Sequence, residues 1–256
     1  MAVLPRVFLE APIAHRALHD AALGIPENSR AAIGRAIEAG YGVELDIQLS
    51  ADGVAMVFHD ATLDRMTSEH GPIKAQSAEA LGRIRLIGSD ETIPTLAEVL
   101  AQISGRVPLL LELKDQSDCL GPGEDRLERA VAADLAGYGG PVAVMSFNPS
   151  MVGAMQRLAP EVPRGLTTCA FDPAAWPQLT PEACTALRSI RAFGPVGARF
   201  ISHDWRDLGS PRVAELRNNE TPILCWTITN PDSEHEARRV AENITFEGYL
   251  PDLTHR

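Results

Sequence analysis

The sequence predicts an α/β protein with the architecture of a (β/α)8 TIM barrel. One pattern recurs along the chain: a short apolar run rich in β-formers, a turn with Pro, Gly or Asp, and an amphipathic segment rich in Ala, Glu and Arg. Strands that alternate with helices in this way form parallel sheets. The chain has 256 residues, and such barrels commonly take about 250 residues as one domain. A doubly wound open sheet is the alternative, but no G-x-G-x-x-G motif follows the first strand.

Eight strands are expected in the core. They cover residues 11–14, 42–49, 107–113, 142–146, 164–168, 199–203, 223–227 and 245–250. A ninth short run, at 54–58, follows the turn Asp52-Gly53. It should pair antiparallel with the second strand as a hairpin.

Helices are expected between these strands. The first covers 28–39, where apolar residues recur at helical spacing after the capping groups of Glu27-Asn28-Ser29. The others each follow a helix-start signal and cover 95–103, 126–136, 149–158, 211–217 and 231–241. The interval 62–94 is not simply a helix, and we expect a small insertion after the second strand. No low-complexity linker interrupts the chain, which predicts a single domain over 1–256.

The composition excludes several classes of protein. With 23 Lys+Arg against 34 Asp+Glu, the formal net charge of −11 argues against a protein that coats nucleic acid or anionic membranes. Arg6 and Glu10 interrupt the N-terminal segment before a secretory signal forms. No stretch approaches the roughly 20 apolar residues of a membrane helix. The four cysteines are scattered, without a C-x-x-C pair, which favours reduced thiols and a cytoplasmic enzyme. A homo-oligomer is left open.

Ionisable residues gather at the predicted strand ends, where a (β/α)8 barrel forms its active site. They are, in chain order, His15, Arg16, Glu44, Asp46, His59, Glu112 and Lys114. Glu44 and Asp46 are two residues apart and share one face of their strand, as do Glu112 and Lys114. Charges in a barrel strand are costly to bury unless they are paired or bind a metal.

These residue types suit phosphoryl chemistry. Three carboxylates offer the oxygen ligands that a hard cation such as Mg²⁺ or Ca²⁺ prefers. Arg16 and Lys114 can neutralise phosphate oxygens. Two histidines can act as a general base and a general acid.

Ordered motifs then point to a family. They are His15-Arg16, Pro26-Glu27-Asn28-Ser29, Glu44-Leu45-Asp46-Ile47-Gln48, Asp52-Gly53, His59-Asp60, Leu63-Asp64-Arg65-Met66-Thr67, Ile93-Pro94-Thr95-Leu96, Leu111-Glu112-Leu113-Lys114, Ser146-Phe147-Asn148, Cys225-Trp226-Thr227 and Glu247-Gly248-Tyr249-Leu250-Pro251-Asp252. With them, the chain resembles the glycerophosphodiester phosphodiesterases, which are metal-dependent hydrolases with a (β/α)8 barrel. The resemblance spans residues 15–252 and is weakest between 165 and 220.

The resemblance implies a reaction, a cofactor and a set of site residues. The reaction is hydrolysis of glycerophosphodiesters, which are small molecules left by deacylation of phospholipids, to glycerol 3-phosphate and an alcohol. The cofactor is one divalent metal ion, Mg²⁺ or Ca²⁺, and segment 62–94 would cover the mouth of the barrel. The implied roles are metal ligand for Glu44, Asp46 and Glu112, acid–base catalyst for His15 and His59, phosphate binding for Arg16 and Lys114, and substrate-pocket wall for Trp226 and Phe147.

One departure from the family leaves alternatives open. Ala17 stands where the family usually has glycine, and its side chain could reshape the phosphate loop because glycine permits positive φ. A non-catalytic phosphodiester-binding homologue is therefore one alternative. The other is phospholipase D-like cleavage of lysophospholipids or sphingolipids, which needs apolar surface such as Ile84-Arg85-Leu86-Ile87. The preferred head group, the metal used in the cell and the nucleophile, water or a glycerol hydroxyl, also stay open.

Overall fold

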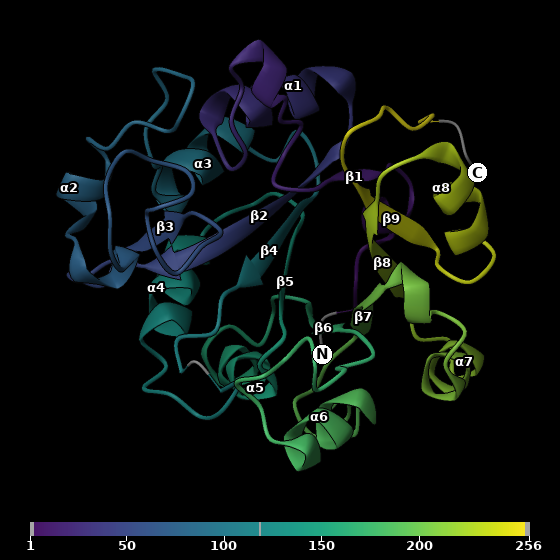
Figure 1. Ribbon diagram of the computed structural model, residues 1–256. Coiled ribbons are helices and arrows are strands. Elements are labelled where there is room, and N and C mark those ends of the chain that lie inside the picture. The colour runs from purple at the N-terminus through teal and green to yellow at the C-terminus, as the bar shows by residue number, and fades with distance from the viewer. Residues whose placement is uncertain (1–2, 118, 254–256) are drawn as a thin grey trace. The chain divides into compact units, whose positions relative to one another are not determined.

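The computed structural model describes residues 3–117 and 119–253. These residues gather in two compact units, whose elements are labelled in Figure 1. The N-terminal unit consists of Ile13–Lys114 and Asp125–Val142. The C-terminal unit consists of the described parts of Met1–Pro12, Asp115–Glu124 and Ala143–Arg256.

The N-terminal unit is built around one buried strand, β2 (Gly42–Leu49). Strands β1 (Ile13–Ala14) and β4 (Leu109–Leu113) pair parallel with β2, and β3 (Ala55–Val57) pairs antiparallel with it as the predicted hairpin. The register of β2 and β4 places Asp46 opposite Glu112. The helices of this unit include α1 (Arg30–Ala39), α3 (Leu96–Ile103) and α4 (Arg126–Leu135), with a short 3-10 turn η2 (Ala21–Leu23) before α1.

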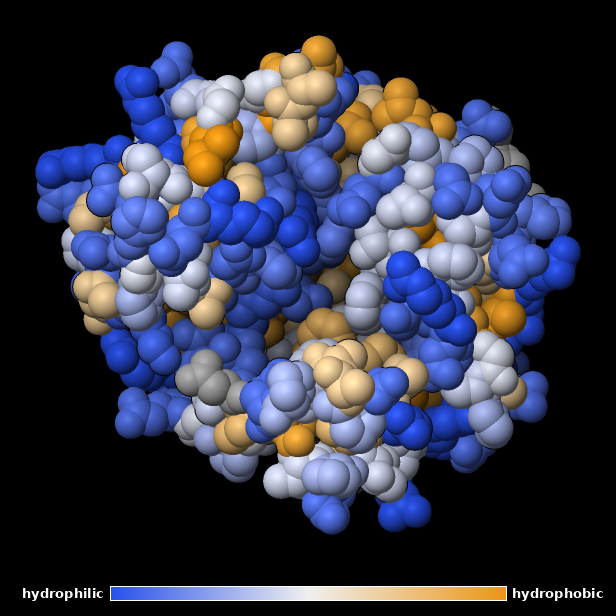
Figure 2. Space-filling view, in the orientation of Figure 1, coloured by the Kyte–Doolittle hydropathy of each residue, from blue (hydrophilic) through white to orange (hydrophobic). Residues whose placement is uncertain are grey.

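The segment 62–94 packs against the hairpin with a small core of its own. It contains the 3-10 turn η3 (Ile73–Ala75) and the short helix α2 (Ala78–Leu81). The buried cluster consists of Met56, Phe58, Leu63, Ile73, Leu81, Leu86 and Ile93. On the face seen in Figure 2, the surface over α2 is mostly hydrophilic, as expected when the apolar residues face inward. The predicted insertion after the second strand is confirmed, whereas its place over the barrel mouth stays a prediction.

The C-terminal unit carries a run of parallel strands, the first of which begins one residue earlier, at Val142 of the N-terminal unit. Strands β5 (Val142–Ser146), β6 (Arg164–Thr168), β7 (Phe200–Asp204), β8 (Ile223–Ile228) and β9 (Asn243–Phe246) pair in this order. The helices are α5 (Pro149–Leu158), α6 (Pro181–Arg188), α7 (Pro211–Asn218) and α8 (Pro231–Ala237), with 3-10 turns η1 (Arg6–Leu9) and η4 (Trp205–Asp207). Pro at the first turn of all four helices fits because that position needs no amide donor.

The observed strands confirm the predicted (β/α)8 class. Strands β2, β5 and β6 have the predicted bounds. The last strand differs: it covers Asn243–Phe246 instead of 245–250. Its first residue is a buried asparagine whose side-chain amide donates to the carbonyls of Phe8 and Ala11, at 2.8 and 2.7 Å. Helix α6 was not predicted. Among the described helices, none is long and apolar enough to cross a membrane.

Candidate active site

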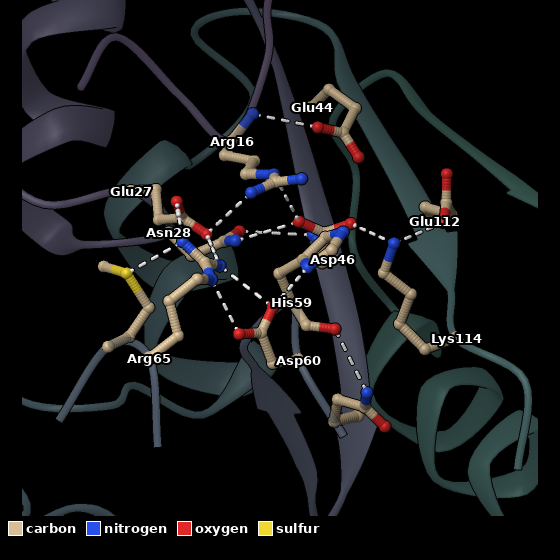
Figure 3. A network of polar contacts seen from close by, with 12 residues as sticks. Arg16, Glu27, Asn28, Glu44, Asp46, His59, Asp60, Arg65, Glu112 and Lys114 are labelled. Atoms are coloured by element: carbon tan, nitrogen blue, oxygen red, sulfur yellow. Dashed lines mark hydrogen bonds and ion pairs between the residues drawn. The ribbon is translucent and has the colours of Figure 1, made fainter. Parts of the chain in front are cut away.

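The seven ionisable residues predicted to carry the chemistry all lie in the N-terminal unit. His15 and Arg16 follow β1, His59 lies two residues after β3, and Lys114 follows β4 directly. The three carboxylates of Glu44, Asp46 and Glu112 come from β2 and β4 themselves. Figure 3 shows most of these side chains pointing toward one another. These residues come together within one compact unit, and the roles expected of them stay predictions.

Three buried carboxylates form the acidic centre of the site. Glu44, Asp46 and Glu112 each offer one ligand oxygen, and these oxygens lie within 4.8 Å of one another. Burial, followed by the charges of Asp46 and Glu112, raises the pKa of Glu44 well above its usual range. Such an excess of buried negative charge is what a bound cation would relieve, and the donor set, all oxygen, fits a hard divalent ion.

Asp46 is the most heavily contacted of the three carboxylates. Its Oδ1 lies 2.8 Å from Lys114 Nζ, and its Oδ2 accepts from Asn28 Nδ2 at 2.9 Å. Arg16 Nε lies 3.5 Å from the same Oδ2. Burial alone would raise the pKa of Asp46, but the charges of Lys114, His59 and Arg16 outweigh it and hold this pKa well below its usual range. Asp46 is therefore ionised at neutral pH.

Lys114 bridges two of the carboxylates. Besides its ion pair with Asp46, its Nζ donates to Glu112 Oε1 at 2.5 Å. Burial opposes a charged ammonium, yet Asp46 and Glu112 together raise the pKa of Lys114. The site therefore holds a fixed positive charge beside the acidic centre.

The loop after β1 presents a backbone amide donor and a side-chain cation, both from Arg16. The amide of Arg16 donates to Glu44 Oε2 at 2.9 Å, and its Nη1 donates to Glu27 Oε1 at 2.9 Å. Arg16 and Ala17 both have positive φ, 52° and 65°. The amide of Ala17 donates to the Glu44 carbonyl at 3.0 Å. The alanine thus adopts the left-handed backbone that the usual glycine permits, at a cost of about 1–2 kcal/mol.

The two histidines predicted as acid–base catalysts both contribute charge at the acidic centre. His59 Nδ1 lies 2.6 Å from Asp60 Oδ1, so a neutral His59 carries its proton on Nδ1 and its lone pair on Nε2. Burial, followed by the charge of Lys114, lowers the pKa of His59. The charges of His59 and His15 both contribute to the low pKa of Asp46, which places the two imidazoles within electrostatic reach of the same carboxylate.

Four residues labelled in the contact network of Figure 3 were not among the predicted site residues: Glu27, Asn28, Asp60 and Arg65. Each had a signal, because all four lie inside motifs that carried the family resemblance. Of the three capping groups expected before α1, Ser29 caps the helix, with its Oγ accepting from Ala32 N at 3.1 Å. This leaves Asn28 to bind Asp46 through both its amide and its carbonyl oxygen, the latter accepting from Asp46 N at 3.2 Å.

Phe147 and Trp226 lie in the C-terminal unit, within an aromatic cluster. Their ring centroids are 5.6 Å apart at an interplanar angle of 81°. Phe171 and Trp176 complete the cluster, with centroids 6.2 and 5.2 Å from that of Phe147. Trp226 Nε1 donates to the Ser202 carbonyl at 3.0 Å. Both predicted wall residues are half-buried, and their contact with substrate stays a prediction.

Known proteins resemble this chain along most of its length. The sequence profile described as "Glycerophosphoryl diester phosphodiesterase family" matches residues 15–243. YhdW of Bacillus subtilis is 28% identical over 228 residues, which are 85% of this chain and 86% of that protein. A glycerophosphodiester phosphodiesterase of Caldanaerobacter subterraneus is 34% identical over 153 residues, which are 56% of this chain and 61% of that protein. A solved structure of an Oleispira antarctica phosphodiesterase in complex with the product sn-glycerol-3-phosphate has a TM-score of 0.75 and 24% identity, covering 94% of each chain. The last similarity confirms the fold.

Proposed function

Since the chain belongs to the glycerophosphoryl diester phosphodiesterase family, we propose that it hydrolyses glycerophosphodiesters to glycerol 3-phosphate and an alcohol. The observation that carries this proposal is the juxtaposition, in one unit, of three buried carboxylates with two cations and two histidines. The carboxylates alone would suit many metal sites. The added cations and histidines suit cleavage of an anionic diester, because charge and protons must both be handled.

Glu44, Asp46 and Glu112 would hold one divalent ion. A bound Mg²⁺ or Ca²⁺ supplies positive charge that stabilises the charge developing on the phosphoryl oxygens. Asn28 and Lys114 would support these ligands, because they fix the orientation of Asp46 and Glu112.

Arg16 and Lys114 would neutralise the diester. Both cations sit against the acidic centre, so a phosphate that enters it meets positive charge on two sides. A guanidinium can bind two phosphate oxygens at once, whereas an ammonium acts as a compact point charge. The pair therefore binds and orients the phosphate before any bond changes.

His59 would act as the general base and His15 as the general acid. The lowered pKa of His59 keeps it neutral near pH 7, and the Asp60 contact leaves Nε2 as its proton acceptor. His59 Nε2 then removes the proton of the attacking oxygen, from water or a neighbouring glycerol hydroxyl. His15 gives a proton to the departing alcohol. Phe147 and Trp226 would line the substrate pocket.

A cytoplasmic location is supported by four free cysteines.

The test is release of the alcohol from glycerophosphocholine, with ethanolamine, inositol and glycerol diesters and lysophosphatidylcholine in the same panel. We expect release that requires Mg²⁺ or Ca²⁺ and stops in EDTA. His15→Ala and His59→Ala should each lose about 10²–10⁴-fold in kcat, whereas His70→Ala, at an exposed histidine of the insertion, should not.

The leaving group separates the two histidine roles. A glycerophosphodiester of 4-nitrophenol needs no proton on its leaving group, so His15→Ala should recover much of its rate with it and His59→Ala should not. Full activity in EDTA would contradict the metal site. Metal binding without turnover of any diester would favour the non-catalytic homologue.

A further inference from the structure

Arg65 of the insertion makes hydrogen bonds to two carboxylates that each hold a different group of the site. Its Nε and Nη2 donate to the two oxygens of Asp60, at 2.7 and 2.9 Å. Its Nη2 and Nη1 donate to the two oxygens of Glu27, at 2.7 and 2.9 Å. Figure 3 shows the guanidinium between these two carboxylates. All three residues lie outside the acidic centre itself.

Each of these two carboxylates also binds a different residue of the site. Asp60 accepts from His59 Nδ1 at 2.6 Å, which fixes the ring and its tautomer. Glu27 accepts from Arg16 Nη1 at 2.9 Å, which fixes the second guanidinium. One side chain thus orients a histidine through Asp60 and a phosphate-binding arginine through Glu27.

The backbone that carries Arg65 is firmly held. Leu63 is fully buried in the core of the insertion, and Thr67 is 2% exposed. Thr67 closes a turn around Arg65, because its amide and its hydroxyl both donate to the Leu63 carbonyl, at 3.1 and 2.9 Å. The side chain of Arg65 is 46% exposed, but its backbone lies between the buried residues Leu63 and Thr67.

We propose that Arg65 is a positioning residue that locks His59 through Asp60 and Arg16 through Glu27, which makes the insertion part of the catalytic apparatus. The effect on turnover rests on the proposed function, whereas the effect on the His59 imidazole does not. A lysine cannot replace Arg65, since an ammonium lacks the planar fork that bonds two carboxylates at both of their oxygens. The substitution Arg65→Lys should therefore behave much like Arg65→Met.

The first test is the ring nitrogen spectrum of His59 in the metal-free protein, assigned with His59→Gln. Wild type and the control Arg85→Met should show His59 as the Nδ1–H tautomer. The control removes an exposed ion pair to Asp90 in the same insertion. Arg65→Met should show a mixture of tautomers. An unchanged His59 spectrum in Arg65→Met would overturn the proposal, whatever the enzyme's substrate proves to be.

The second test separates the contact through Asp60 from the contact through Glu27, by steady-state kinetics with glycerophosphocholine. Asp60→Asn should lower kcat, Glu27→Gln should raise KM, and Arg65→Met should do both, each by about 10–100-fold as for removal of an orienting partner. Arg65→Met and Asp60→Asn should be non-additive in kcat, because they act on one chain of contacts. Additive losses, or wild-type kinetics in Arg65→Met, would contradict the proposal.

Discussion

Asp46 is the residue on which the polar contacts of the active site converge. Its side chain is 1% exposed, and Lys114, Asn28 and Arg16 all contact its oxygens. A buried carboxylate is stable only when such partners compensate for lost hydration. The same contacts make each partner costly to remove, because the remaining charge stays buried.

Lys114 gives the sharpest test of this dependence. Lys114→Met should lower the free energy of unfolding of the metal-free protein by about 3–5 kcal/mol, the usual cost of breaking a buried pair. Mg²⁺ should restore part of the loss, because it compensates the same carboxylates. The measurement is urea denaturation with and without Mg²⁺. Lys74→Met, at an exposed lysine of η3, is the control. An equal effect of the two substitutions would contradict the arrangement.

The sequence revealed the charged residues of the site better than their partners. Glu44, Asp46 and Glu112 stand out because charge inside predicted strands is unusual, and Lys114 directly follows one of these strands. Asn28 does not stand out, since an asparagine before a helix looks like a cap, and only the tertiary contact with Asp46 shows its other role. Long-range polar contacts leave no periodic signal in a sequence.

At the scale of elements, strands with strong apolar or mixed patterns were predicted well and irregular ones poorly. Strand β2 keeps its predicted bounds because eight consecutive buried residues leave little freedom. The predicted bounds of β9 were too late in the sequence, because its first residue, the buried Asn243, is of a type common in turns. Helix α6 was missed although Thr180 caps it, its hydroxyl accepting from Ala183 N at 3.2 Å, and Pro181 begins it.

Gly165 in β6 tests the packing between neighbouring strands. A Cβ at this position would overlap the ring of Phe200, which is fully buried on the adjacent strand β7. Gly165→Ala should lower the free energy of unfolding by about 1–3 kcal/mol through overpacking. Adding Phe200→Leu in a double variant should recover part of that loss, because leucine is smaller than phenylalanine.

The matched control for this prediction lies in a helix of the same unit. Gly153→Ala in α5 would place its Cβ at an ordinary 3.6 Å from Val196, and alanine favours helix, so it should be neutral or stabilising. The measurement is the denaturant midpoint of wild type, Gly165→Ala, Gly165→Ala with Phe200→Leu, and Gly153→Ala. A Gly165→Ala variant as stable as Gly153→Ala would contradict the packing described for β6 and β7.

At the scale of the whole molecule, stability should depend on pH through a buried histidine of the C-terminal unit. His203 is 1% exposed; its Nδ1 lies 2.7 Å from Thr168 Oγ1 and its Nε2 lies 3.1 Å from Asp207 Oδ2. Burial lowers its pKa below the ordinary 6.5, against the pull of Asp207 and Asp204. Below pH 6.5 the unfolded chain therefore binds more protons than the folded one.

The contribution of His203 to stability is complete above pH 6.5 and is lost as the pH falls toward the folded pKa. In urea denaturation, the free energy of unfolding should decrease as the pH is lowered from about 7.5 to about 5.5. Its slope against pH should be shallower in His203→Gln than in wild type. His235→Gln, on the exposed side of α8, should keep the wild-type slope. Equal slopes in all three proteins would exclude a neutral, buried His203.

The central claim is that one acidic centre, formed by Glu44, Asp46 and Glu112, serves the cleavage of a glycerophosphodiester. The most direct measurement is ³¹P NMR of glycerophosphocholine with the enzyme and Mg²⁺, in wild type and in Glu44→Gln. We predict that the diester signal gives way to that of glycerol 3-phosphate with wild type, and that the variant leaves it unchanged. Equal conversion by the variant, or conversion by wild type in EDTA, would contradict the claim.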